Sequence, residues 1–247
     1  MRGLWQLTWI EIKLFLREPA AAFFTLVFPL MVLFIFGSIY GNEPTPFFGG
    51  YGTVDVSVPA YTAMIIASSG LIGLTIVIAM YRERGVLRRL RATPLRPQTI
   101  LSANVIVSFL MTALGMALLV IAGKIVFGLR FAGDLVSVFA AFTLSSLSFF
   151  ALGFVLAGLA PTARTAQVAG MVLFYPMLFL SGAAVPLEVL PQTIRQYAQF
   201  LPLTHVVTLL RGMWIGESWN QHGMEVGILA AVLVIGVAVS MKTFRWE

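Results

Sequence analysis

The chain alternates between long apolar blocks and short polar segments. A helix needs about 20 apolar residues to cross a bilayer core of roughly 30 Å. Blocks of that length lie at residues 20–40, 60–81, 99–123, 135–160, 166–185 and 224–241. The pattern therefore predicts a single-domain, all-α integral membrane protein with six transmembrane helices.

Basic residues gather on one side of these predicted spans. Of the 16 Lys and Arg residues, 12 fall within residues 1–19, within 82–98, at Arg164 and in the C-terminal tail. Cytoplasmic segments of membrane proteins carry this excess, so both termini are expected in the cytoplasm and the chain in the cytoplasmic (inner) membrane. The net charge of +6 then reflects contact with membrane lipids, and no nucleic acid partner is expected.

Composition narrows the chemistry further. Hydrophobic residues make up 59% of the 247 residues and charged residues 11%, a balance that argues against a water-soluble fold. The absence of cysteine excludes disulfides and thiolate metal sites. With only two histidines, a multi-histidine metal centre is not expected, so no metal site is predicted.

Residues 1–19 are too polar to span and follow an amphipathic pattern. One polar stripe of the helical wheel holds Arg2, Gln6, Lys13 and Arg17. This segment is expected to form an interfacial helix in the headgroup layer. Glu11 falls on the apolar side, where its carboxylate needs a basic residue of this chain or a surface on another protein. An interfacial anchor and a docking surface are the two alternatives.

The segment 82–98 contains six arginines, more than orientation in the membrane requires. Leu87 and Leu90 lie three residues apart, and Thr93 and Pro94 follow them, a pattern that predicts a short helix stopped by proline. Leucines displayed among arginines are typical of a protein contact surface. Docking is therefore favoured over a purely topogenic role.

Two external segments separate the remaining spans. The Gly- and Pro-rich loop 41–59 has no basic residue and predicts turns. Residues 186–222 keep apolar stretches too short to span, divided by three prolines, and predict short re-entrant helices at the outer surface.

Small and aromatic residues mark possible contacts within the spans. Small residues recur at Ser69, Gly70, Gly73, Gly153 and Gly170, and they favour close helix packing within one chain over a seam between two chains. In the fifth predicted span, Phe174, Tyr175 and Phe179 surround Pro176. Such a segment is typical of a kinked helix whose aromatic rings contact either a substrate or lipid.

Motifs for catalysis and nucleotide binding are missing from the sequence. It contains no GxxxxGK[ST] phosphate loop, no HExxH and no GxSxG. Ionisable residues are scarce in the centres of spans two to five, which argues against an ion-coupled secondary carrier or channel. An intramembrane enzyme would need convergent polar groups, and the nearest candidate is His205 with Glu188 or Glu217.

Three stretches resemble the permease subunits of type 2 ABC exporters, a family that includes exporters of drugs, nodulation factors and polysaccharides. They are FLREPAAAFFTLVFPLMVLFIFG at residues 15–37, RERGVLRRLRATPLRP at 82–97, and FLSGAAVPLEVLPQTIRQYAQFLPLTHVVTLLRGMWIG at 179–216. The first is similar to the family's arginine-proline lead-in and first span. The second resembles its cytoplasmic loop, and the third its external segment after the fifth span.

The resemblance implies a non-catalytic permease that moves an amphiphilic drug, lipid or glycan outward. A second permease subunit, identical or related, and two separate ATP-binding subunits would complete the exporter. ATP and Mg would bind those subunits, and this chain would hold no cofactor. Coupling to the ATPase is expected at Glu11, Glu83, Arg84, Gly85, Leu87, Arg88, Arg89, Thr93 and Pro94. Substrate contact is expected at Ser69, Gly73, Phe174, Tyr175 and Phe179.

Overall fold

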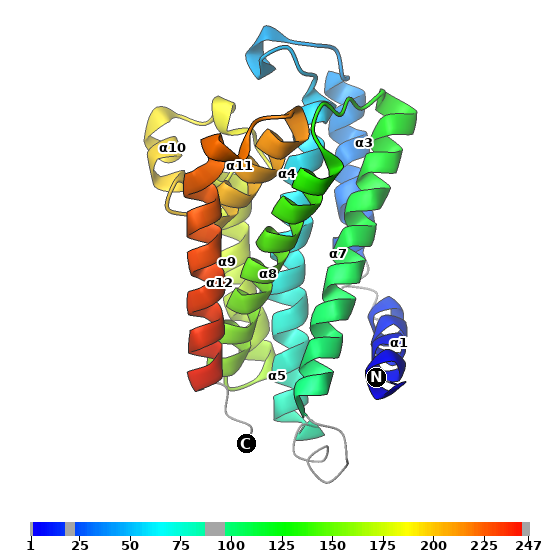
Figure 1. The fold of residues 1–247 in the computed structure, drawn as a ribbon, viewed down its shortest axis with the longest axis vertical. Helices are drawn as coiled ribbons and strands as arrows, with labels where there is room; N and C mark the ends of the chain where they lie inside the picture. The colour runs from blue at the N-terminus through cyan, green and yellow to red at the C-terminus, as the bar shows by residue number, and fades with distance from the viewer. Residues whose placement is uncertain (1, 18–22, 87–96, 244–247) are drawn as a thin grey trace.

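The computed structural model describes residues 2–17, 23–86 and 97–243. Throughout these residues the regular structure is helical, and no strand is present among them. The predicted fold class, an all-α integral membrane protein, is confirmed (Figure 1).

Long helices and short helical turns alternate along the chain. The α-helices are α1 (Arg2–Arg17), α3 (Phe28–Tyr40), α4 (Thr53–Ser68), α5 (Thr75–Glu83), α7 (Pro97–Phe127), α8 (Leu135–Leu159), α9 (Ala163–Leu180), α10 (Gln192–Ala198), α11 (Pro202–Ile215) and α12 (Gly223–Thr243). Two π-helical turns, η1 (Phe23–Val27) and η3 (Ser69–Leu74), continue into α3 and join α4 to α5. The 3-10 turns are η2 (Pro46–Phe48), η4 (Leu187–Val189) and η5 (Trp219–His222).

Five helices of the described residues are long and apolar enough to cross a membrane: Thr53–Glu83, Thr99–Phe127, Leu135–Leu159, Ala163–Leu180 and Trp219–Thr243. They correspond to the second through sixth predicted spans. The first predicted span, 20–40, is represented by the shorter apolar helix Thr25–Tyr40, and residues 18–22 lie outside the described residues. A count of six spans therefore stays a prediction.

Two predicted boundaries are wrong. The second membrane helix begins at Thr53 instead of residue 60, with Pro59 inside α4. The helix starts early because Asp55, close to its N-terminus, has hydrogen-bond partners in two loops. The fifth membrane helix ends at Leu180 instead of 185, because Gly182 adopts a positive φ of 92° that turns the chain.

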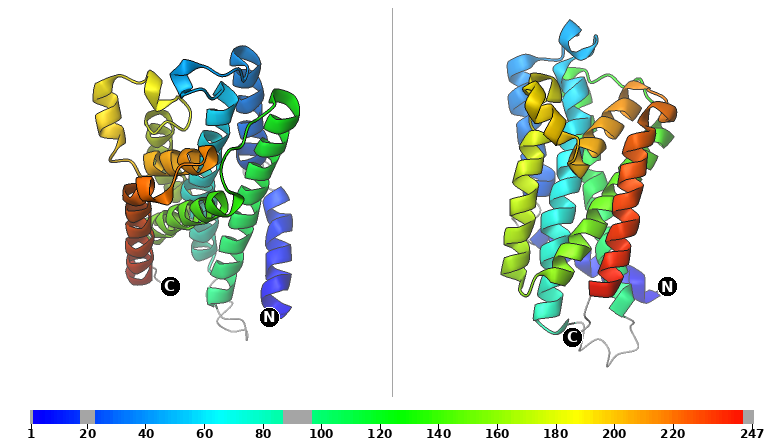
Figure 2. Two further views of the ribbon diagram at one scale, coloured as in Figure 1. Left: turned by 45° about the horizontal axis from the view of Figure 1, so that its top comes forward. Right: turned by 90° about the vertical axis from the view of Figure 1, so that its left-hand side faces the viewer.

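The helices run between two ends of an elongated bundle (Figures 1 and 2). At the lower end of Figure 1 lie α1, the C-terminal ends of α5 and α12, and the start of α7. At the upper end lie η2, α10 and α11. The helix formed by α4, η3 and α5 is the most enclosed of the five, because it contacts α7, α8 and α9.

Glycines bring the helices into backbone contact at η3. A Cβ on Gly153 of α8 would lie 2.2 Å from the carbonyl oxygen of Gly70, and a Cβ on Gly170 of α9 would lie 2.1 Å from that of Leu71. Side chains there would force α8 and α9 away from η3. Close packing of these glycines within one chain, as predicted, is confirmed, while a Cβ on Gly73 would meet nothing closer than the Ser68 carbonyl oxygen at 3.9 Å.

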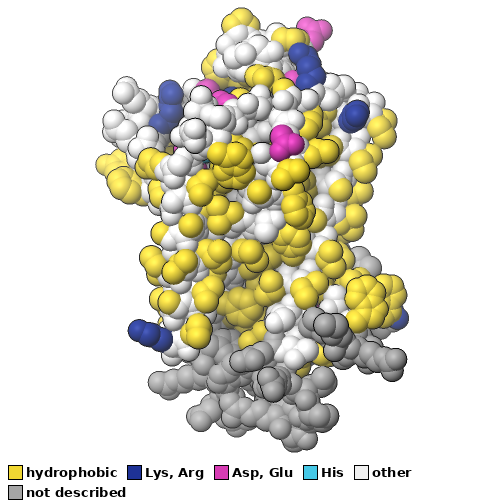
Figure 3. All heavy atoms as spheres, in the orientation of Figure 1, with side chains coloured by type: hydrophobic (Ala, Val, Ile, Leu, Met, Phe, Trp, Pro, Cys, Tyr) yellow, Lys and Arg dark blue, Asp and Glu magenta, His cyan; other side chains and the backbone are white. Residues whose placement is uncertain are grey.

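The surface in Figure 3 has a broad hydrophobic middle, with charged side chains toward the two ends. Exposed apolar side chains on α9 and α12 include Val168, Val172, Val234 and Ile235. A lipid environment accounts for this exposure, since apolar side chains are stable there.

Candidate functional site

Arg82 and Glu83, at the lower end of α5, bind the turn between α8 and α9. The Arg82 guanidinium donates from Nη1 to the carbonyl oxygen of Gly158 at 2.7 Å and from Nη2 to that of Ala160. These carbonyl groups lie at the C-terminal end of α8, which carries partial negative charge. A cation is therefore well placed at this position.

Glu83 makes the complementary contact with α9. Its Oε2 atom accepts a hydrogen bond from the backbone N–H of Ala163 at 2.7 Å, and Ala163 is the first residue of α9. The N-terminal end of a helix carries partial positive charge, which favours a carboxylate. We refer to Arg82 and Glu83, with these contacts, as the clamp. It joins α5 to the α8–α9 turn.

The sequence prediction included Glu83 but missed Arg82. Arg82 and Glu83 bond to backbone atoms about 80 positions away in the chain. Any residue type can supply these backbone atoms, so the sequence around residues 158–163 gives no sign of the contact. The available signal was the placement of an Arg-Glu pair at the end of an apolar helix.

Only part of the predicted coupling segment is described. Arg84 ends α5 and is exposed, and Gly85 has a φ of 64°, a left-handed conformation that glycine adopts readily. The other predicted coupling residues of this segment, Leu87, Arg88, Arg89, Thr93 and Pro94, lie outside the described residues. Their predicted role stays a prediction.

Glu11 contacts the bundle through α1, which packs against α7. The Tyr81 hydroxyl donates a hydrogen bond to Oε1 of Glu11 at 2.6 Å. Partial burial raises the pKa of Glu11 above its usual value, and the hydrogen bonds from Tyr81 and Asn104 oppose that rise. Among the described residues, the partners of Glu11 are thus Tyr81 and Asn104, and neither is basic.

The opposite face of α1 is apolar and exposed. Trp5 and Trp9 are exposed there, and the Lys13 ammonium lies 5.3 Å from the centre of the Trp9 ring. Aromatic residues beside a lysine suit the membrane interface. Residues 1–19 were expected to be either an interfacial anchor or a docking surface. This arrangement supports the interfacial anchor.

The structure does not gather the predicted substrate residues on one face. Phe174 is buried in the core, whereas Tyr175 and Phe179 are exposed on another side of α9. Ser69 is buried in η3, and Gly73 lies four residues further along the same turn. Their role in a substrate path stays a prediction.

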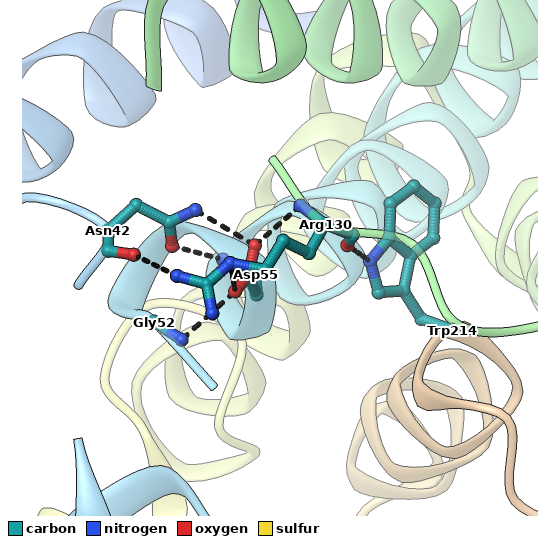
Figure 4. Close-up of polar contacts among 5 residues, drawn as sticks. All are labelled: Asn42, Gly52, Asp55, Arg130 and Trp214. Atoms are coloured by element: carbon teal, nitrogen blue, oxygen red, sulfur yellow. Dashed lines mark hydrogen bonds and ion pairs between the residues drawn. The ribbon is translucent and has the colours of Figure 1, made fainter. Parts of the chain in front are cut away.

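A polar network at the upper end holds two loops and α11 against α4 (Figure 4). The fully buried carboxylate of Asp55 accepts hydrogen bonds from Asn42 Nδ2 at 2.9 Å, from the Gly52 N–H at 3.0 Å and from the Arg130 N–H at 2.8 Å. The Arg130 carbonyl in turn accepts a hydrogen bond from Trp214 Nε1 of α11 at 3.0 Å. The network ties α4 to the α3–α4 loop, the α7–α8 loop and α11.

A cavity of about 700 Å³ opens beside this network. Its walls come from the upper ends of α3 and α4, from the segment 182–189 and from α11. Within it, Arg211 of α11 and Glu188 of η4 form an ion pair with an N–O distance of 2.5 Å. None of the predicted substrate residues lines this cavity. Sequence reasoning missed it because its walls come from segments far apart in the chain.

The proposed catalytic grouping for an intramembrane enzyme does not form. His205 Nε2 lies 2.8 Å from the backbone oxygen of Gln199. Glu188 is paired with Arg211, and Glu217 lies 2.7 Å from His222. His205 is therefore paired with neither Glu188 nor Glu217, the two alternatives for such an enzyme.

Comparison with known proteins places the chain in a family. The family model described as "ABC-2 type transporter" matches residues 2–214. The chain is 34% identical to Nodulation protein J of Rhizobium leguminosarum bv. viciae over 102 residues, which cover 41% of this chain and 39% of that protein.

Two relatives from Escherichia coli (strain K12) match a longer stretch. Over 169 residues, the chain is 23% identical to "Probable multidrug ABC transporter permease YbhR", covering 66% of this chain and 46% of the relative. Over 181 residues it is 24% identical to "Probable multidrug ABC transporter permease YbhS", covering 73% and 45%. The chain thus spans less than half the length of the curated relatives it matches.

Proposed function

Because the chain belongs to the ABC-2 type transporter family, we propose that it is the permease subunit of an ATP-driven exporter in the cytoplasmic membrane. A second permease subunit, identical or related, pairs with it. Two separate ATP-binding subunits, which hold ATP and Mg, dock on its cytoplasmic side. The lack of a phosphate-loop motif in the sequence supports a separate ATPase, and the distribution of basic residues supports cytoplasmic termini.

The clamp is the observation that carries this proposal. Arg82 and Glu83 are the last two residues of a membrane helix, and the arginine-rich segment 84–98 follows them. Any displacement of that segment by an ATPase would pull on α5, and through the clamp on the ends of α8 and α9. Motion driven by ATP would in this way reach two membrane helices at once.

The substrate in this proposal is an amphiphile. Apolar spans without a line of buried charges suit such a molecule better than an inorganic ion. The relatives from Escherichia coli are named as probable multidrug permeases, which agrees with transport of organic molecules. Outward direction and the path along Ser69, Gly73, Phe174, Tyr175 and Phe179 belong to the same proposal.

The test is co-purification with the ATP-binding subunit. The chain would be expressed with the ATPase encoded beside it and purified in detergent, as wild type and as an Arg84→Ala, Arg88→Ala, Arg89→Ala variant. We expect a stable, ATP-hydrolysing complex for the wild type. In the triple variant we expect most of the bound ATPase to be lost, because the docking segment loses three positive charges.

A matched control is Lys242→Ala, which removes a basic side chain from the last turn of α12 at the same end of the bundle. This variant should retain the ATPase. If wild-type protein binds no ATPase at all, the exporter proposal is wrong. If the triple variant binds the ATPase as well as wild type does, docking occurs elsewhere on the chain.

A further inference from the structure

The cavity at the upper end has the dimensions of a binding site for a small organic molecule. Its volume of about 700 Å³ lies within the range of drug-binding pockets, roughly 300–1,000 Å³. Aromatic rings from three segments line it: Phe36 and Tyr40 of α3, Phe47 and Phe48 of η2, and Tyr61 of α4. An apolar molecule, or the apolar part of an amphiphile, would be stable against these rings.

The charges in and beside the cavity are mainly negative. Glu188, Glu217 and Arg211 line its wall. His222 contacts Glu217 and faces Glu225, whose carboxylate oxygen lies 3.8 Å from Nδ1. Three carboxylates therefore stand against one guanidinium and one histidine. The sum is negative whether or not His222 is protonated.

Glu188 retains capacity to accept a hydrogen bond. Its Oε1 atom pairs with Arg211, while its Oε2 atom is buried and has no hydrogen-bond partner among the described residues. A carboxylate accepts several hydrogen bonds, and one left without a donor in a buried place is unfavourable. Among the described residues, Arg211 is therefore the one donor that stabilises the Glu188 carboxylate.

From these observations we propose that the upper cavity binds lipophilic organic cations. The excess carboxylates attract the positive charge, and the aromatic walls hold both the apolar body and, through cation–π contact, the cation itself. Its role as a late substrate site on the way out rests on the exporter function proposed above. The binding itself requires only this chain.

Other ligands fit the cavity less well. An organic anion would meet Glu188 and Glu217, and the arginine of the wall, Arg211, is already paired with Glu188. A sugar chain needs many hydrogen-bonding groups, whereas most of the wall is aromatic or aliphatic. A segment of a second copy of this chain could also fill the space, and it would then prevent a small cation from binding.

The test compares two ions of nearly equal shape and opposite charge. The full chain, purified without an ATPase in a non-ionic detergent, would be titrated with tetraphenylphosphonium and with tetraphenylborate, with empty micelles as blank. We expect saturable binding of the phosphonium and none of the borate above the blank. Equal binding of both ions, or no phosphonium binding, would overturn the proposal.

Substitutions locate the binding in the cavity. Glu188→Gln keeps the size of the side chain and removes its charge, and we expect at least about tenfold weaker binding of the phosphonium. Phe48→Leu should weaken binding severalfold through loss of the ring face. The matched controls Glu43→Gln and Phe200→Leu change exposed residues that do not line the cavity, and they should bind like wild type.

A stability measurement guards against misfolding. Each variant would be accepted only if its elution profile and thermal unfolding match those of wild type. If Glu188→Gln and Phe48→Leu fold and bind the phosphonium as tightly as wild type, the site lies elsewhere and the proposal fails. Because no ATPase is present, this failure is distinct from failure of the exporter proposal, which the co-purification decides.

Discussion

The two ends of the bundle are held together in different ways. At the upper end, Asp55 is fully buried and joins two loops to α4, and Trp214 extends the network to α11. At the lower end, Arg82 and Glu83 reach from α5 to the α8–α9 turn, and Glu83 is exposed. Among the contacts of the described residues, a buried network fixes the upper end, whereas partly exposed hydrogen bonds join the helices at the lower end.

Because of this difference, we expect the upper end to be rigid and the lower end to move more easily. A buried carboxylate with three donors is costly to disturb, because each donor would lose its partner. Contacts of partly exposed side chains are weaker and can break and form again in water. The upper end is therefore suited to keeping a binding cavity in shape, and the lower end to passing on a movement.

Breaking the upper network should have the largest effect on stability. Asp55→Ala leaves Asn42, Gly52 and Arg130 without an acceptor, and we expect a loss of about 3–5 kcal/mol. Thermal unfolding in detergent, together with the yield of monodisperse protein, measures it. Glu43→Ala removes an exposed carboxylate at the same end and should leave the unfolding temperature unchanged. Equal stability of both variants would show that the Asp55 network does not fix the upper end.

The contact of α8 with η3 lies between the two ends, and a substitution there should have the second largest effect on stability. Gly153→Ala places a Cβ against the carbonyl oxygen of Gly70, and we expect a loss of about 1–3 kcal/mol from the resulting shift of α8. Gly73→Ala, in the same π-helical turn, meets nothing closer than 3.9 Å and should be nearly neutral. Unfolding curves for the two variants test this, and indistinguishable curves would refute close packing at η3.

Breaking the clamp should alter transport more than stability. Arg82→Ala and Glu83→Ala each remove charge-assisted hydrogen bonds to the α8–α9 turn, and we expect transport per ATP hydrolysed to fall by at least about fivefold. Export and hydrolysis would be measured together in proteoliposomes containing the ATPase. Glu83→Gln keeps an oxygen acceptor for the Ala163 N–H and should recover part of the coupling. Unchanged coupling in all three variants would contradict the role of the clamp.

The smallest effect concerns pH at α1. Burial raises the pKa of Glu11 above its usual value of 4.5, so the folded chain favours the protonated form. The stability of α1 docking is then complete below pH 4.5 and decreases as pH rises through the raised pKa. Glu11→Gln should abolish this dependence. The mobility of a spin label at Leu14→Cys, followed from pH 4 to 8, measures it, and a pH response in the Gln variant would assign the effect to another group.

The long membrane helices could be predicted from the sequence, because apolar blocks of sufficient length identify them without knowledge of neighbours. The start of α4 could not. Pro59 and Asp55 are residue types typical of loops, so the sequence predicted a loop there. The buried Asp55 carboxylate is stable in α4 because Asn42 and Arg130 donate hydrogen bonds to it.

The sites were predicted less completely than the helices. Glu83 was recognised from its family resemblance, but its partner is the backbone of Ala163, which has no distinguishing side chain. The cavity brings together residues as distant as Phe36 and Glu217, so no local pattern indicates it. Phe174 and Tyr175 are adjacent in sequence and yet differ in burial, because neighbouring residues of a helix point about 100° apart.

The most direct test of the central claim is whether ATP-driven movement reaches the α8–α9 turn through the clamp. The chain contains no cysteine, so spin labels at Arg164→Cys on α9 and Met241→Cys on α12, in labelled chain diluted with an excess of unlabelled chain, report the distance between these two positions within one chain. It would be measured in the complex with the ATPase, without nucleotide and with ATP plus vanadate. We predict a change in that distance for the wild-type clamp and none after Arg82→Ala with Glu83→Ala. The same change in the presence and absence of the clamp would contradict the account.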